Sequence, residues 1–171
     1  LYTIRERELI LDLFESLVGA RLLYGFFQVG GVRYDLPDGW AATCRKTVDL
    51  LEERISEYER MLEDNPFFMA RAEGVGVISR ELAEDVGISG PLLRGSGVAY
   101  DLRRADPYSA YEDFDFGIPV EASGDCLARY RVRMVEFRES LNIVRQVLDT
   151  LPEGPVSSRP GLKSVAQTRI P

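Results

Sequence analysis

The sequence contains no histidine and only two cysteines, Cys44 and Cys126, among its 171 residues. Histidine is the commonest general base near neutral pH and the commonest metal ligand in proteins. With no Cys-x-x-Cys pair, the segment does not build a thiolate metal site by itself. Cysteines so far apart in the sequence also argue against a disulfide framework and favour a reducing cytosolic compartment.

Long apolar runs and an excess of positive charge are missing too. No run approaches the roughly 20 apolar residues that a membrane span needs, and the N-terminus does not resemble a signal peptide. A net charge of −7 argues against a nucleic-acid surface. The length is enough for one ordinary domain with a core. Because the chain starts at Leu1 and ends in a polar, proline-containing tail, we expect a piece of a longer protein.

Apolar periodicity predicts three long helices. The first runs from Arg5 to Phe27, and the second from about Gly39 to Glu63, where Asn65-Pro66 stops it. The third, from Asp125 to Leu151, would span roughly 40 Å. Its apolar seam has alternating spacings of three and four: Leu127, Tyr130, Met134, Phe137, Leu141, Val144, Leu148 and Leu151. The predicted fold is mainly α with little strand, a bundle of long helices.

Shorter elements are expected between the second and third long helices. Ser79 is a predicted N-cap for a short helix from Arg80 to Val86, and a glycine-punctuated loop runs from Ser89 to Asp101. A second short helix is expected from Asp106 to Tyr111, and an edge strand from Phe114 to Val120. Residues 1–155 are predicted to form a helical core segment, and residues 156–171 a connector to a missing C-terminal part.

Candidate functional residues gather in the glycine loop and at the start of the third long helix. Gly95-Ser96-Gly97 matches neither glycine pattern of phosphate-binding loops, and no strand–turn–helix surrounds it. We instead expect a tight loop whose backbone closely approaches a neighbouring element. The candidates for structural or partner-contact roles are Arg94, Gly95, Gly97, Asp101, Arg103, Asp125 and Arg129. No catalytic residue and no metal ligand is assigned within the chain.

The charges around these candidates leave two interpretations open. Arginines and Asp101 beside the loop would form either a buried salt-bridge network or a surface that faces a partner subunit. On the third helix, Asp125 and Arg129 are spaced to pair, as are Arg145 and Asp149. Cys126 lies in the first turn of that helix, where a thiol can become reactive, but a small buried residue is the favoured interpretation.

An ordered set of motifs resembles one known family. The set covers Glu6 to Pro155 and includes Gly30-Gly31-Val32, Asp35-Leu36-Pro37, Gly74-Val75-Gly76, Ser89-Gly90-Pro91-Leu92-Leu93-Arg94-Gly95-Ser96-Gly97-Val98, Tyr100-Asp101-Leu102-Arg103, Gly124-Asp125-Cys126 and Leu151-Pro152-Glu153-Gly154-Pro155. It is similar to the hydrogenase-like core subunit of respiratory complex I, the proton-pumping NADH:quinone oxidoreductase. That subunit is called D in bacteria and H in the plastid-type complex.

The resemblance implies a middle fragment of that subunit, with the helical fold of the large subunit of [NiFe] hydrogenases. In the family, the subunit lies peripherally on the cytoplasmic side of the membrane, against the subunit that carries the terminal iron–sulfur cluster. Together the two subunits form the cavity where quinone is reduced. In the family, quinone reduction uses a His and a Tyr near the N-terminus of the hydrogenase-like subunit. Because this chain has no histidine, the resemblance implies an assembly role, no cofactor bound by the segment itself, and no activity for the isolated fragment.

The motif from Gly124 to Tyr130 reads Gly-Asp-Cys-Leu-Ala-Arg-Tyr, where many complex I members have Gly-Asp-Cys-Tyr-Asp-Arg-Tyr. It resembles the plastid and cyanobacterial branch and parts of the membrane-bound hydrogenase branch, which leaves NADH and a ferredoxin open as electron donors. One alternative is a membrane-bound energy-converting [NiFe] hydrogenase, which needs Cys-x-x-Cys pairs before and after this region. Another is a stand-alone helical interaction module, which needs a gene that starts and stops near these ends.

Overall fold

The computed structural model describes residues 2–158, which are mainly helical as predicted, with one two-stranded sheet. Two compact units divide the chain: Leu1–Thr47 with Leu151–Pro171, and Val48–Thr150. The elements are α1 (Tyr2–Val18), β1 (Phe27–Gln28), β2 (Gly31–Val32), α2 (Trp40–Glu63), α3 (Pro66–Ala72), α4 (Arg80–Asp85), α5 (Gly90–Gly95), α6 (Leu102–Ala105), the 3-10 helix η1 (Tyr111–Asp113) and α7 (Cys126–Asp149).

In the first unit, α1 is shorter than predicted and ends at Val18. The prediction to Phe27 is wrong because Gly19 turns the chain with a φ of +75°, and Leu23 follows with a φ of +59°. Such positive φ angles are incompatible with a right-handed helix. The indole N–H of Trp40 donates to the carbonyl of Leu13 over 3.0 Å, which joins α1 to the start of α2.

The predicted connector begins as part of this first unit. Strands β1 and β2 form an antiparallel hairpin, and residues 156–158 run along β2. The Val32 N–H donates to the Val156 carbonyl over 3.0 Å, and the Ser158 N–H donates to the Gly30 carbonyl over 2.8 Å. A side chain at Gly31 would collide with the Val156 carbonyl, so glycine permits this pairing. Residues 159–171 of the predicted connector lie outside the described residues.

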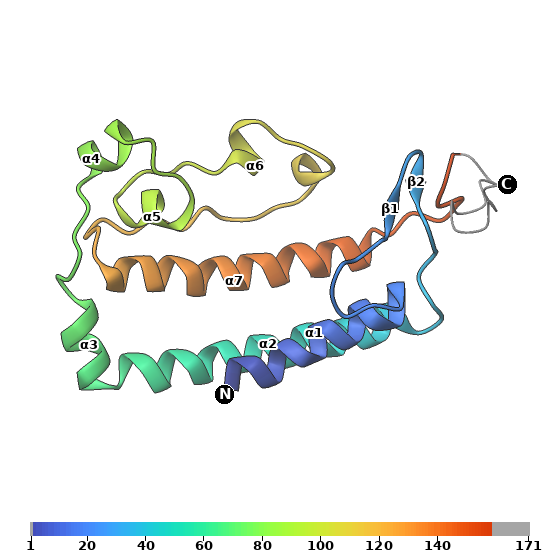
Figure 1. The fold of residues 1–171 in the computed structure, drawn as a ribbon, viewed down its shortest axis with the longest axis horizontal. Coiled ribbons are helices and arrows are strands. Elements are labelled where there is room, and N and C mark those ends of the chain that lie inside the picture. Colours follow the sequence, from blue (N-terminus) through green and yellow to red (C-terminus); the bar gives the residue numbers. More distant parts are fainter. Residues whose placement is uncertain (1, 159–171) are drawn as a thin grey trace, which may run out of the picture. The chain divides into compact units, whose positions relative to one another are not determined.

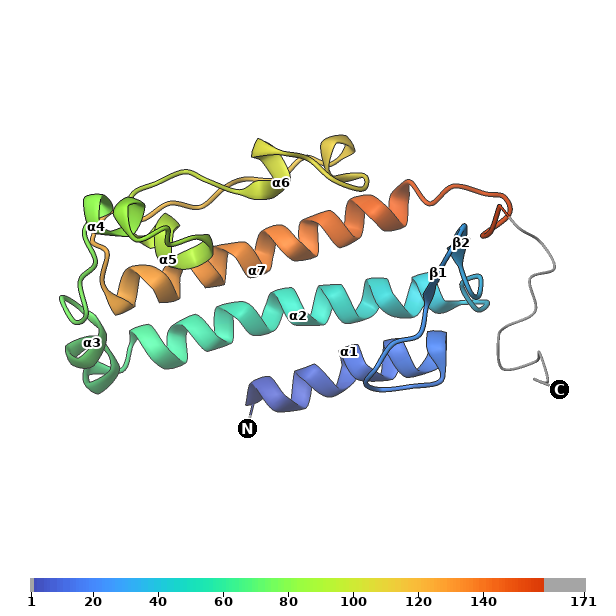
Figure 2. The same cartoon turned by 45° about the horizontal axis from the view of Figure 1, so that its top comes forward.

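In the second unit, the 48–63 part of α2 and α7 run antiparallel (Figures 1 and 2). The predicted seam of α2 is buried at Val48, Leu51, Ile55 and Tyr58. The Asn65 side chain accepts from backbone N–H groups at the start of α3, and Ser79 caps α4 as predicted.

Helix α7 buries two faces, whereas its periodicity predicted one. From the predicted seam, Leu127, Leu141 and Leu148 are buried. Val132 and Ile143, outside the predicted seam, are buried as well. Helix α5 packs against α7, and α7 lies between α2 and the segment that carries α4, α5 and α6 (Figure 2). The segment that carries α4, α5 and α6 thus covers a second face of α7. The spacing of apolar residues within α7 does not predict this second face.

Three predictions between residues 89 and 120 are wrong. Part of the glycine loop is helix α5, and the next short helix is α6, which starts earlier than the predicted Asp106. Residues 114–120 pair with no strand among the described residues. Their backbone instead forms hydrogen bonds with polar side chains of α7. The Asp115 N–H donates to the Gln146 side chain over 2.8 Å, and the Gly117 N–H donates to the Glu139 side chain over 2.9 Å.

Within residues 2–158, none of the helices combines the length and the apolar character that a membrane crossing requires.

The second apolar face of α7 gives a direct test of this packing. Val132 is fully buried, whereas Val135 on the same helix is 39% exposed. We expect Val132→Asp to lower the free energy of unfolding by about 3–5 kcal/mol, because it buries an unpaired charge. Val135→Asp is the matched control and should cost less than about 1 kcal/mol. Urea unfolding followed by circular dichroism measures both, and equal losses would contradict the two-faced packing.

Candidate functional site at the start of α7

The candidate residues fall into two groups along α7. Gly95, Asp125 and Arg129 meet at its N-terminus. Arg94, Asp101 and Arg103 lie further along the helix, in an ion network with Glu136. Gly97 belongs to neither group, since it occupies a turn with a φ of +92° and open space beside it.

The first group lies where three chain segments meet, and we call this place the α7 entry. It consists of residues 74–78, 95–96 and 123–126, together with the side chain of Arg129. Backbone hydrogen bonds join the segments: Ile78 N–H to the Gly124 carbonyl (2.9 Å), Gly124 N–H to the Gly95 carbonyl (2.8 Å), and Cys126 N–H to the Val75 carbonyl (3.0 Å). The α7 entry is therefore a joint made of main chain.

Two glycines allow the segments of the α7 entry to approach so closely. Gly124 has a φ of +65°, and a Cβ atom there would lie 2.2 Å from the carbonyl oxygen of Ile78. A Cβ atom on Gly95 would lie 3.1 Å from Cγ of Arg129. The first approach leaves no room for any side chain, and the second is tight enough that a side chain on Gly95 would require Arg129 to shift.

Asp125 is the N-cap of α7. Its carboxylate accepts from the backbone N–H groups of Ala128 (2.7 Å) and Gly74 (2.8 Å) and from the Ser123 hydroxyl (2.9 Å). Burial raises the pKa of Asp125, but these donors outweigh it and hold the pKa below its ordinary value of 3.8. The charged carboxylate thus satisfies orphan donors and the helix dipole together.

The predicted pair of Asp125 and Arg129 does not form, because the Asp125 oxygens accept from those donors instead. The Arg129 guanidinium donates to the carbonyls of Gly124 (2.6 Å) and Gly76 (3.0 Å) and lies 3.1 Å from the Cys126 sulfur. Arg129 therefore braces the α7 entry through carbonyl groups. Within residues 2–158, no three His, Cys, Asp or Glu side chains are grouped to hold a metal ion.

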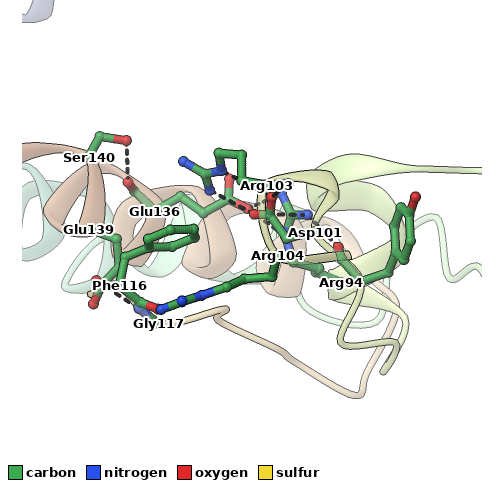
Figure 3. A network of polar contacts seen from close by, with 10 residues as sticks. Arg94, Asp101, Arg103, Arg104, Phe116, Gly117, Glu136, Glu139 and Ser140 are labelled. Carbon is green, nitrogen blue, oxygen red and sulfur yellow. Dashed lines mark hydrogen bonds and ion pairs between the residues drawn. The ribbon is translucent and has the colours of Figure 1, made fainter. Parts of the chain in front are cut away.

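The second group is a largely buried ion network (Figure 3). The Arg94 side chain is only 8% exposed, and its guanidinium donates to Glu136 (2.6 Å) and to the Tyr100 carbonyl (2.7 Å). It also lies 3.8 Å from the carboxylate of Asp101. The Arg94 charge therefore meets acceptors inside the fold, as burial of a charge requires.

Asp101 pairs more closely with Arg103 than with Arg94. The Arg103 guanidinium donates to both carboxylate oxygens of Asp101, over 3.0 and 2.7 Å. Hydrogen bonds from Arg103 lower the pKa of Asp101, and those to Asp101 raise the pKa of Arg103. The Arg103 and Arg104 guanidinium groups also lie over the ring of Phe116, at 4.8 and 4.3 Å from its centroid, a cation–π arrangement.

A third set of charges, which the sequence did not predict, joins α7 to α2. Arg131 pairs with Glu63 at 3.2 Å, Arg138 with Glu59 at 2.5 Å, and Arg145 with Asp49 at 2.9 Å and with Glu52. Arg145 thus pairs across the two helices, with residues of α2 that the sequence analysis did not link to it. Because the arginines recur every seven residues, they occupy one side of α7. That spacing was the signal available in the sequence.

These residues define a helical scaffold segment, in which glycines and charged side chains hold backbone segments and helices together. Residues 1–169 match the family described as respiratory-chain NADH dehydrogenase, 49 Kd subunit. The chain belongs to this family, which confirms the resemblance drawn from its motifs.

Individual relatives carry related names. The chain is 47% identical to the D-type subunit of the NADH-quinone oxidoreductase of Desulforamulus reducens, over 93% of this chain and 43% of the relative. It is 53% identical to the H-type subunit of the NAD(P)H-quinone oxidoreductase of Synechococcus sp. (strain JA-3-3Ab), over 91% of this chain and 40% of the relative. Among solved structures, a chain of the membrane-bound sulfane sulfur reductase, an archaeal respiratory membrane complex, has a TM-score of 0.88 at 41% identity, over 96% of this chain and 45% of that one. The chain spans about two fifths of the length of these curated relatives.

The close approach at Gly124 can be tested against a glycine of the same conformation. Gly124 and Gly87 have φ angles of +65° and +68°, but only Gly124 has an atom in the way. Gly87→Ala should cost about 1–2 kcal/mol, the penalty of a left-handed backbone. Gly124→Ala should cost at least about 3 kcal/mol, since overpacking is added. Chemical unfolding of both variants measures the difference, and similar values would rule out the tight joint.

The buried network can be compared with a surface ion pair. Arg94→Ala leaves Glu136 without its charged partner in a largely buried place, so we expect a loss of about 3–5 kcal/mol in unfolding free energy. Arg80 pairs with Glu84 on the surface, with side chains 60% and 49% exposed, so Arg80→Ala should cost less than about 1 kcal/mol. Thermal and urea unfolding report both values, and a mild Arg94→Ala variant would contradict a structural role for the network.

Proposed function

We propose that this chain is the middle part of the hydrogenase-like core subunit of a proton-pumping NADH:quinone oxidoreductase. The observation that carries the proposal is its identity of 47% and 53% to two quinone oxidoreductase subunits, over nine tenths of the chain. In this proposal the subunit lies peripherally on the cytoplasmic side of the membrane. It borders the subunit with the terminal iron–sulfur cluster, and the two form the quinone-reducing cavity.

The contribution of this segment is positional. The main-chain joint at the α7 entry and the ion network at Arg94 fix the loop 89–101 against α7. A cavity shared between subunits needs walls that hold their places, because small displacements of reacting groups cost large factors in rate. The segment would supply such a wall, while other parts of the complex carry out the electron transfer.

The cofactors of such a complex belong to other parts of it. The described residues do not fit an iron–sulfur cluster, since no three potential ligands gather within residues 2–158 and a cluster takes four ligands, usually cysteines. The chain also has no histidine to protonate a reduced quinone. We therefore assign the cluster to the neighbouring subunit and the quinone-reducing residues to parts of the subunit outside this chain.

The electron donor is NADH or a ferredoxin, the two donors that the motif from Gly124 to Tyr130 leaves open. A second candidate acceptor comes from the solved relative at 41% identity, which belongs to a sulfane sulfur reductase. An energy-converting [NiFe] hydrogenase is the remaining alternative from the motifs. All three complexes would use the segment as the same helical scaffold.

The test is to purify the native complex that contains this chain, measure its nickel and iron, and assay three acceptors. We expect iron without nickel, and inhibitor-sensitive reduction of a short-chain quinone that exceeds reduction of sulfane sulfur or protons. An Arg94→Ala complex should show reduced assembly, and an Arg80→Ala complex should assemble normally. Stoichiometric nickel with hydrogen evolution, or reduction of sulfane sulfur alone, would overturn the quinone proposal.

A further inference from the structure

The segment 102–120, which we call the flap, leaves and rejoins the rest of the second unit at one residue, Arg94. Just before the flap, the Arg94 guanidinium donates to the carbonyl of Tyr100 over 2.7 Å. Just after it, the N–H of Glu121 donates to the Arg94 carbonyl over 3.0 Å. Because the Arg94 side chain is itself buried, both ends of the flap are fixed at one point inside the fold.

Between these ends the flap is held together by its own side chains (Figure 3). Phe116 is its only buried residue. The guanidinium groups of Arg103 and Arg104 lie over the Phe116 ring, and the Tyr111 ring meets it edge-to-face with centroids 6.3 Å apart. Arg104 also donates to the Phe116 carbonyl over 2.9 Å. These contacts tie the first part of the flap to its last part.

The two short helices of the flap follow the same rule. Helix α6 packs on η1, and neither of them packs on another helix or strand among the described residues. By contrast, α5, which precedes the flap, packs on both α4 and α7. The flap is therefore a small substructure that is joined more extensively to itself than to the helices around it.

Three polar side chains of α7 hold the flap in place. Glu139, Asn142 and Gln146 are spaced by three and four residues, so they share one side of the helix. The Gln146 side chain accepts from the Asp115 N–H over 2.8 Å and donates to the Asp115 carbonyl over 2.6 Å. Asn142 donates to the same carbonyl over 3.1 Å, and Glu139 accepts from the Gly117 N–H over 2.9 Å. We call these three side chains the latch.

The latch contacts only the main chain of the flap. The Asp115 side chain points away from it and is fully exposed in the described chain, where its one ion pair is with Arg104 at 3.5 Å. All four latch hydrogen bonds are exposed as well. Hydrogen bonds of this kind contribute about 0.5–1.5 kcal/mol each, far less than the buried charges at the two ends of the flap.

We propose that the flap opens as one piece about its two ends at Arg94, while α5 and α7 stay in place, and that the latch keeps it closed. Local opening is favoured where few apolar side chains are buried and the backbone hydrogen bonds are exposed. The flap meets both conditions, whereas the Arg94 network and the α7 entry meet neither. The inference goes beyond the proposed function and does not rest on it, because every contact involved lies within this chain.

Hydrogen–deuterium exchange of the intact complex, followed by mass spectrometry, tests the opening. Asn142→Ala combined with Gln146→Ala removes three of the four latch hydrogen bonds. We expect exchange in the flap to accelerate at least about tenfold, equally in residues 104–106 and 115–117, with α5 and α7 unchanged.

Two control variants should leave exchange in the flap unchanged. Ser140→Ala removes a hydrogen bond from the same helix to its own Glu136 carbonyl. Asp115→Ala removes a side chain that the latch does not contact, together with one exposed ion pair of little value.

The exchange pattern decides between the alternatives. Slow flap exchange that ignores the latch variants would mean that other parts of the complex hold the flap, and would overturn the inference. Acceleration confined to residues 115–117 would show that the flap does not move as one piece, and equal acceleration in α5 and α7 would show a general loss of stability; either result overturns it. If the double variant does not assemble, Asn142→Ala alone should give the same pattern with about threefold acceleration. Because no activity is read, the result is independent of the electron acceptor.

Discussion

The approach of Gly124 to the carbonyl of Ile78 is the constraint on which the second unit depends. At this point main chain meets main chain, so the hydrogen bonds from Ile78 and from Gly124 fix three segments directly, and the side chains of Asp125 and Arg129 add further bonds. Asp125 follows at once and turns the fixed backbone into the first turn of α7. The direction of the longest helix of this unit, and the position of α5 beside it, both start from that joint.

Ion pairs hold the rest of α7 against its neighbours. The contribution of each pair to stability depends on how deeply it is buried. Arg94 and Asp101 have side chains that are 8% and 6% exposed, so losing one partner leaves a desolvated charge. The three arginines that face α2 are partly exposed, with side chains between 31% and 42% accessible, where single ion pairs contribute little. The buried network therefore determines how the loop 89–101 lies on α7, while the pairs with α2 mainly set the alignment of two helices.

Local signals predicted local structure well. The period of apolar residues found α2 and α7 nearly to their ends, and Ser79 marked the start of α4. Features that depend on distant residues were missed. The burial of Val132, outside the predicted seam, has no signal within α7 itself, and the pairs of α7 with α2 join positions 68 to 96 residues apart. Helix α1 was overextended because Leu23 adopts a positive φ, which an apolar residue gives no reason to expect. The candidate residues were found by motif, but their division into a main-chain joint and an ion network needs the structure.

In the proposed function, the acceptor of the electrons is set outside this segment. Its backbone superimposes with a TM-score of 0.88 on a chain of a sulfane sulfur reductase, while its sequence is 53% identical to a quinone oxidoreductase subunit. One scaffold thus accompanies proteins named for different acceptors. The structural features found here are consistent with this. A capped helix, a glycine joint and a buried ion network hold the fold together and do not depend on which electron acceptor is used.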